Sequence, residues 1–259
     1  MNIRPIAFLW LSILVCGCGR PVRPEDSDVP EEVRTLISSY QGLVKGYAKG
    51  RILFKKGDPI IFDDGKEKTF TEKLAGADIQ DMFSIPYSRT NNPPGYLQDA
   101  GRIRCEAFLK RIYGDSEKAV KANLVTVKWF DGQKIPFNRV GGAADSLRAV
   151  FIDLQKLPEE FHDYCRGASS FNWREVRGAK QMSAHSFAIA IDINTEYSNY
   201  WRWDNPDAGE LDRIGHKNRI PEEIIRIFES HGFISGSRWY HYDTMHFEFR
   251  PELLLFSGQ

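Results

Sequence analysis

The sequence predicts a mixed α+β fold for a chain that is long enough to form a full hydrophobic core. Its 259 residues are 42% hydrophobic and 13% aromatic, which is typical of a globular protein. Stretches with helical spacing of apolar residues occur among short runs rich in β-branched and aromatic residues. Turn-forming residues are spread throughout, and no internal repeat or low-complexity block interrupts them. Helices and strands are therefore expected to mix along the chain.

The first residues have the composition of an export signal. Arg4 supplies a positive charge, and the run 6–15 is apolar apart from one serine. A transmembrane helix needs ~20 apolar residues, so this run predicts a signal peptide rather than a membrane span. Residues 1–18 are therefore expected to lie outside the mature fold.

Cys18 is the expected attachment point of a lipid. The segment VCGC at 15–18 resembles a bacterial lipobox, in which a small residue precedes the cysteine that becomes the lipidated first residue. Residues 19–33 contain three prolines and several charges, which predicts a tether. We therefore expect an exported protein held by a lipid anchor on the periplasmic or outer side of a bacterial membrane. A plain secretory signal cleaved nearby is the alternative.

Residues 34–135 are expected to form an N-terminal lobe of uncertain fold. Short apolar runs between glycines and aspartates suggest that its first half is β-rich; they are Arg51–Phe54 and Pro59–Phe62. Helical spacing then follows over Arg102–Tyr113 and is closed by Gly114. A strand is predicted at Leu124–Phe130, where a β-branched and aromatic run ends at a turn formed by Asp131 and Gly132.

Residues 136–259 are expected to form a C-terminal domain. A helix is predicted where apolar residues recur with helical spacing up to Pro158, at Leu147, Val150, Phe151, Leu154 and Leu157. A later helix opens at Pro221, buries Ile224, Ile225 and Phe228, and ends near Gly232. Two strands are predicted, at Phe187–Ile193 and at His246–Phe249.

The charge balance excludes one class of binding partner, and the cysteine content leaves the presence of a disulfide open. Lys and Arg number 35, as do Asp and Glu, so the formal net charge is zero and nucleic acid is not expected as a partner. The mature chain retains Cys105 and Cys165. In an oxidising compartment they form either one disulfide or two buried free thiols, and the sequence favours neither.

The segment SAHSFAIAIDIN, 183–194, carries two candidate metal ligands. In an extended strand the apolar residues from Phe187 to Ile193 would share the core face, and small alanines followed by Asp192 would face a metal and a substrate. His185 precedes Asp192 by seven positions, or ~23 Å in an extended chain. Zinc–ligand bonds measure only ~2 Å, so the chain must bend between Ser186 and Ala188.

The segment HYDTMHFEF, 241–249, supplies further candidates. If His246 begins a strand, then His246, Glu248 and Arg250 share one face while the phenylalanines between them pack inward. Asp243 would point to the wrong face of a continuous strand, so a turn at residues 244 and 245 is required.

These residues together predict a metal site that none of them predicts alone. A single His is more often a satisfied core or surface group, and a single Asp is more often a turn residue. Two imidazoles and one carboxylate, however, are the ligand set of an open catalytic zinc site, in which water takes the fourth position. No HExxH helix and no G-x-S-x-G segment occurs, which excludes the thermolysin-like and nucleophile-elbow layouts.

The two segments resemble the signature of the M15 family of zinc DD-carboxypeptidases and peptidoglycan endopeptidases, Ser-x-His-x-x-Gly-x-Ala-x-Asp followed by Asp-x-x-His-Phe. The matching residues are Ser183, His185, Ala190 and Asp192, then Asp243, His246 and Phe247. The resemblance extends over about 140–255 and includes FNWREVRG at 171–178. One departure is Ala188, which stands where the family has glycine. The resemblance implies a small antiparallel sheet that carries a zinc site between helices, as in M15 DD-peptidases and hedgehog-like domains, with an N-terminal extension.

The resemblance also implies roles. It assigns one zinc ion to His185, Asp192 and His246, and the general base to Asp243. Arg174 is the expected cation for the oxyanion, with Arg177 as the second choice, and Ser183 and Glu248 are expected to orient the ligand imidazoles. Four aromatic residues flank the motifs and are expected either in the core or along a substrate groove; they are Trp201, Trp203, Trp239 and Tyr240.

The resemblance also implies the substrates, which are peptidoglycan muropeptides cut either at a terminal D-Ala–D-Ala bond or within the stem peptide. Zinc would lower the pKa of a bound water to ~7, and a carboxylate could take its proton. The alternative function is a non-catalytic envelope lipoprotein that binds zinc or muropeptides.

Overall fold

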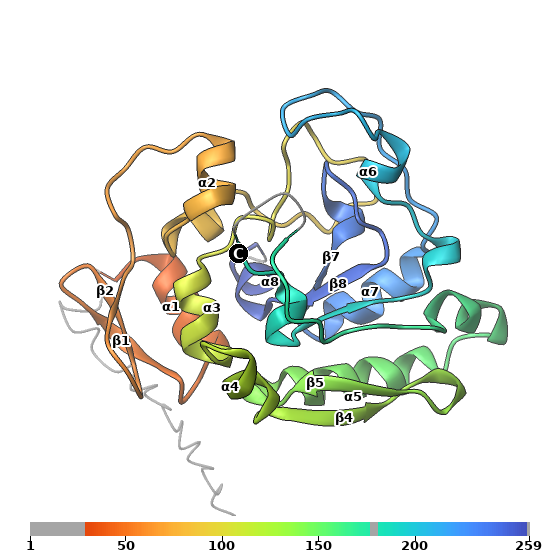
Figure 1. The fold of residues 1–259 in the computed structure, drawn as a ribbon, viewed down its shortest axis with the longest axis horizontal. Coiled ribbons are helices and arrows are strands. Elements are labelled where there is room, and N and C mark those ends of the chain that lie inside the picture. Colours follow the sequence, from red (N-terminus) through yellow and green to blue (C-terminus); the bar gives the residue numbers. More distant parts are fainter. Residues whose placement is uncertain (1–28, 177–180, 258–259) are drawn as a thin grey trace, which may run out of the picture.

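The computed structural model of the chain describes residues 29–176 and 181–257 (Figure 1). The predicted signal peptide, Cys18 and most of the predicted tether lie outside the described residues, as does Arg177. Among the residues described, no helix has the length and apolar character needed to cross a membrane.

The described residues combine helices with three small antiparallel sheets, which confirms the predicted α+β class. In the first sheet β2 (Arg51–Phe54) lies between β1 (Val44–Ala48) and β3 (Ile60–Ile61). The second is a hairpin of β4 (Leu124–Lys128) and β5 (Lys134–Asn138). In the third, β8 (His246–Phe249) lies between β6 (Ala190–Asp192) and β7 (Phe233–Ser235). The α-helices are α1 (Glu31–Ser39), α2 (Phe70–Gly76), α3 (Glu106–Tyr113), α4 (Glu117–Lys121), α5 (Ala143–Leu154), α6 (Trp201–Asp204), α7 (Glu222–Ser230) and α8 (Pro251–Phe256).

The N-terminal region is β-rich at 44–61, as expected, but helices flank its sheet (Figure 1). Helix α1 begins at Glu31, within the stretch expected to be tether, and Val33 and Leu36 are fully buried. It packs on the C-terminal helix α8, and the Tyr40 hydroxyl donates to Glu252 Oε2 at 2.8 Å. The two ends of the described chain therefore stabilise each other.

Two predicted elements are shorter than expected. Helix α3 begins at Glu106 rather than at Arg102, because Arg102 and Arg104 lie in a loop where their guanidinium groups pair with distant carboxylates. Strand β4 ends at Lys128, two residues early, because Asp131 and Gly132 adopt positive φ angles of 54° and 71° and turn the chain into β5. The turn residues were identified correctly, but the turn begins sooner.

Helix α7 packs against β7 of the third sheet, and α5 packs against α7. The predicted apolar residues of α5 are buried against the β4–β5 hairpin and α7, except Leu157, which follows the helix and is half-buried. Helix α7 begins after Pro221 as predicted, and its Phe228 ring stacks on Phe247 of β8 at a centroid distance of 3.8 Å. One face of β8 is thus fixed in the core. His246, Glu248 and Arg250 lie on the other face.

Candidate metal centre and its pocket

The third sheet places two of the predicted ligands directly opposite each other. Asp192 ends β6 and pairs in register with His246, the first residue of β8. Cross-strand partners in an antiparallel pair bring their Cβ atoms to within about 5.5 Å on the same face. The sheet register alone therefore brings the carboxylate and the imidazole together.

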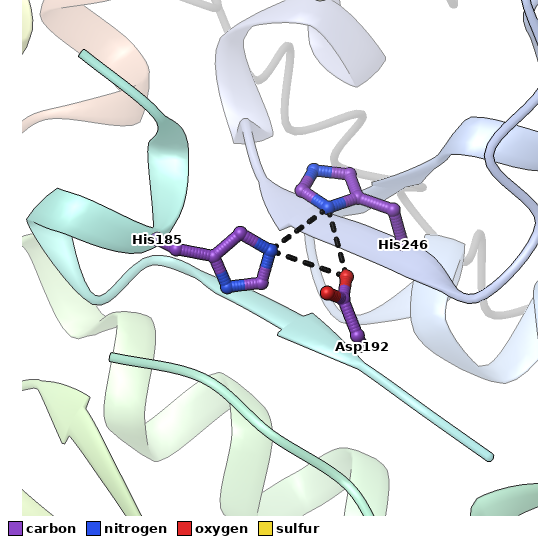
Figure 2. Close-up of side chains that lie close together, drawn as sticks. All are labelled: His185, Asp192 and His246. Atoms are coloured by element: carbon purple, nitrogen blue, oxygen red, sulfur yellow. Dashed lines mark hydrogen bonds and ion pairs between the residues drawn. The ribbon is translucent and has the colours of Figure 1, made fainter. Parts of the chain in front are cut away.

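His185 reaches this pair because the chain before β6 bends sharply, as the spacing requires. Residues Ala184–Phe187 form a 3₁₀ turn, and Ala188 follows in the left-handed conformation with φ 51° and ψ 42°. The strand predicted from Phe187 therefore begins only at Ala190. Ala188 and Ala190 are both fully buried, so they do not line an open face above the strand as expected. Figure 2 shows His185 pointing back toward Asp192 and His246.

Ala188 provides a direct test of the strain in this bend. Ala188→Gly and Ala190→Gly each remove one fully buried methyl group, but only position 188 has a positive φ. A left-handed alanine costs about 1–2 kcal/mol, which glycine relieves. We expect the free energy of unfolding of Ala188→Gly to exceed that of Ala190→Gly by about 1 kcal/mol or more. Urea denaturation of both variants measures this, and equal values would show that Ala188 is unstrained.

The three side chains present their ligand atoms to one another. His185 Nε2 lies 3.1 Å from Asp192 Oδ1 and 3.2 Å from His246 Nδ1, and the latter two atoms are 3.1 Å apart (Figure 2). Tetrahedral zinc with bonds of ~2.0–2.1 Å separates its ligands by ~3.3 Å. Two nitrogens and one oxygen in this triangle therefore fit a zinc ion in both donor type and spacing. The triad is one of the groups among the described residues that could hold a metal.

The charge around the triad also suits a cation. Burial alone would raise the pKa of Asp192, yet the two imidazoles hold it well below its ordinary value. Burial would lower the pKa of His246, but its contacts with Asp192 and Glu248 raise it to about 9. The same negative field that favours a proton on His246 favours a metal ion at the same nitrogen.

The remaining nitrogen of each imidazole has its own partner, which fixes how the ring lies. His185 Nδ1 donates to the Ser170 carbonyl at 2.7 Å, and His246 Nε2 faces Glu248 Oε2 at 3.4 Å. Both arrangements leave the nitrogen that points into the triad as the lone-pair donor. Glu248 thus takes the position expected of it. Ser183 does not: its Oγ accepts from the His185 backbone N–H at 3.4 Å and caps the 3₁₀ turn instead.

Glu248 is itself held by two arginines, one of which the sequence did not identify. Arg104 donates to Glu248 Oε2 at 2.6 Å and Arg250 donates to Oε1 at 3.1 Å. Burial opposes ionisation, but the charge of Arg104 outweighs it and keeps the pKa of Glu248 well below its ordinary value. The carboxylate facing His246 is therefore ionised and fixed in place.

A pocket of about 470 Å³ opens over the triad. Asp243 lines it, since the chain turns at residues 244 and 245, as predicted, and the His246 N–H donates to the Asp243 carbonyl at 3.0 Å. Asp243 Oδ1 is buried and makes no hydrogen bond within the described residues. Burial first, and then the charge of Asp192, raise the pKa of Asp243 to about 6. A free carboxylate oxygen with a pKa near neutrality has the properties of a general base.

Arg174 lines the same pocket but is exposed. Its backbone N–H donates to Ser186 Oγ at 2.9 Å, which ties this stretch to the turn that carries His185. Its guanidinium group donates only to the neighbouring Glu175 carbonyl, at 3.3 Å, among the contacts described. The backbone is thus fixed while the charged end is available to a ligand.

The four flanking aromatic residues were expected either in the core or along a substrate groove, and the structure shows both cases. Trp201 and Trp239 are buried yet line the pocket, whereas Trp203 lines it with 57% of its surface exposed. Tyr240 is buried and does not line it. The pocket also includes Arg102, Arg104, Tyr200 and His241, which no sequence pattern identified as site residues.

Cys105 and Cys165 are buried free thiols rather than a disulfide. Burial raises the pKa of Cys105 to about 11 and that of Cys165 to about 12. Neither thiol is therefore reactive at neutral pH.

Comparison with known proteins confirms the resemblance to the M15 family. Residues 177–249 match the model of an M15 peptidase family described as D-alanyl-D-alanine carboxypeptidase. This segment contains both motifs and all three ligands of the triad. Neither the curated proteins nor the solved structures contain a match to this chain.

Proposed function

We propose that this protein is a zinc-dependent peptidase that hydrolyses peptide bonds in the stem peptides of peptidoglycan. The observation that carries the proposal is the convergence of three metal-ligand atoms and an unpartnered carboxylate oxygen, that of Asp243, in one pocket. A structural zinc site needs no free carboxylate beside it, whereas a hydrolytic site does. The match to a carboxypeptidase family supports the same reaction and suggests a substrate that contains D-amino acids.

Each residue would have a distinct task in this reaction. Zinc bound by His185, Asp192 and His246 supplies an activated water and a Lewis acid. Asp243 accepts the proton of the attacking water at its free Oδ1 and returns it to the leaving amine. The guanidinium group of Arg174 stabilises the negative charge that develops on the carbonyl oxygen.

The proposed location is the bacterial cell envelope, where such substrates occur. Lipid attached at Cys18 would hold the protein on the membrane, and residues after it would let the folded part reach the cell wall. The bond cleaved is either the terminal D-Ala–D-Ala bond or one inside the stem peptide, and the pocket would admit the one whose flanking residues it accommodates.

Digestion of purified muropeptides by the zinc-loaded protein tests the proposal. Mass spectrometry should show loss of one terminal D-Ala for a carboxypeptidase, or two peptide fragments for an endopeptidase. Metal analysis should give one zinc per chain. A protein that holds zinc, binds muropeptides and cleaves none would instead be the non-catalytic lipoprotein.

Replacing Arg174 by Ala should lower kcat by about tenfold to a hundredfold and leave the zinc content unchanged, because its guanidinium group contacts no ligand of the triad. Arg148→Ala is the matched control, since Arg148 is an exposed arginine on α5 that pairs with Asp145. A rate for Arg174→Ala equal to that of the control would remove Arg174 from the reaction.

A further inference from the structure

His241 is a buried histidine beside the triad for which the proposed reaction has no use. It is 1% exposed, and its ring packs against Trp201 at a centroid distance of 4.6 Å. Its backbone N–H donates to Asp99 Oδ1 at 2.9 Å, and its ring Nδ1 lies 2.6 Å from Asp99 Oδ2. The Asp99 carboxylate therefore binds both the backbone and the ring of His241, which fixes the orientation of the imidazole.

The contacts of Asp99 determine which ring nitrogen carries the proton. Burial opposes the ionisation of Asp99, but the hydrogen bond from His241 and the charge of Arg102 keep its pKa below the ordinary value. An ionised carboxylate can only accept, so Nδ1 of His241 is the donor. In a neutral ring Nε2 then carries no proton and can only accept a hydrogen bond.

The charged groups around His241 are two arginines and two carboxylates. Arg102 donates to Glu210 at 2.9 and 3.0 Å and pairs with Asp99 at 3.2 Å. Arg202 donates to Glu210 at 2.9 Å. The charges of these two arginines thus offset those of the two carboxylates beside the ring.

The other ring nitrogen of His241, Nε2, has no hydrogen-bond partner among the described residues. It is buried, and the Glu210 carboxylate oxygen at 3.8 Å lies beyond hydrogen-bond distance. Leaving a buried acceptor without a partner costs about 1–3 kcal/mol, so such atoms are rare without a reason. His241 lines the same pocket as Asp243 and the triad, and a ligand there would meet this atom.

We infer that His241 is a substrate-binding residue whose Nε2 accepts a hydrogen bond from an N–H group of the substrate. This inference rests on the proposed function and specifies how that site holds its substrate. Two N–H sources exist in a stem peptide: a backbone amide next to the bond that is cut, and the ammonium group of a diamino acid. Asp99 acts as the positioning residue, because it holds Nδ1 protonated and so keeps the lone pair on Nε2.

His241→Asn tests the inference while preserving the contact with Asp99. The asparagine amide nitrogen replaces Nδ1 as the donor to Asp99, and nothing replaces Nε2. KM for muropeptides should rise by about tenfold, as expected for one lost hydrogen bond, while kcat and zinc content stay within about twofold of wild type. An unchanged KM, or a fall in kcat alone, would overturn the inference.

Asp99→Asn gives a second, independent test. The amide donates to Nδ1 and drives the proton to Nε2, which turns the acceptor in the pocket into a donor. KM should rise at least as much as in His241→Asn, although His241 itself is intact. An unaltered KM in this variant also contradicts the inference.

Altered substrates identify the N–H group. Stem peptides in which each amide N–H in turn is replaced by an ester oxygen, and one in which norleucine replaces the diamino acid, are compared on wild type and His241→Asn. The substitution that abolishes the difference between the two proteins marks the donor, and a difference that survives every substitution overturns the inference. If the wild type cleaves nothing, the proposed function fails, and calorimetry then decides the binding role from a tenfold weaker Kd in His241→Asn.

Discussion

Asp243→Asn should lower kcat by about a hundredfold to ten-thousandfold while the protein keeps one zinc per chain. Asparagine has nearly the same shape as aspartate, and Asp243 Oδ1 makes no hydrogen bond in the described structure that the exchange would break. What disappears is the ability to take a proton from water and return it to the amine. Steady-state kinetics on muropeptides and metal analysis of the same preparation measure the two quantities.

The matched control is Asp145→Asn on the outer surface of α5, where the carboxylate only pairs with Arg148. It should retain wild-type kinetics. If Asp243→Asn kept wild-type turnover, another group would have to serve as the base. If it lost zinc instead, Asp243 would be supporting the metal, and its free oxygen would no longer distinguish a hydrolytic site from a structural one.

His185→Ala should reduce activity to below about 1% of wild type and leave the protein unable to retain zinc through dialysis. Loss of a residue that only orients a ligand costs 10–100-fold in metal affinity or activity, and loss of a ligand must cost more. The remaining Asp192 and His246 offer two donors, fewer than the three that a catalytic zinc site uses. Chelation of the wild-type protein should have the same effect, and added zinc should reverse it.

His231→Ala is the control for this experiment, because His231 is a partly exposed histidine that pairs with Asp153 and does not line the pocket. It should bind zinc and turn over as the wild type does. Zinc retained by His185→Ala at wild-type affinity would mean that the three side chains do not form the metal site.

The triad was predictable because its evidence is local in sequence. The spacing of His185 and Asp192 required a bend, and the polar face of the strand that starts at His246 required a turn before it; both are present. The start of β6 was not predictable, since buried apolar residues from Phe187 to Ile193 suit a strand as well as a 3₁₀ turn followed by a short strand.

The residues that hold the site residues in place could not be predicted from the sequence, for a different reason. Arg104 meets Glu248 across 144 positions and Asp99 meets His241 across 142, and no local pattern encodes such pairs. The apolar residues of 102–113 recur with helical spacing, so the sequence predicted a helix where Arg102 and Arg104 lie in a loop. The role of Ser170 could not be predicted either, because it accepts the hydrogen bond from His185 through its backbone carbonyl, which any residue could supply.

The buried charges behind His246 also bear on how such a protein can evolve. Glu248 is paired with Arg104 from the N-terminal half, and Glu252 accepts from Tyr40 near the described N-terminus. Recombination that moved only residues 181–257 into another protein would leave Glu248 without Arg104 and Glu252 without Tyr40, with Arg250 as the arginine that still pairs with both. The metal-binding segment is therefore a poor unit of exchange between genes, and we expect inheritance of the two halves together.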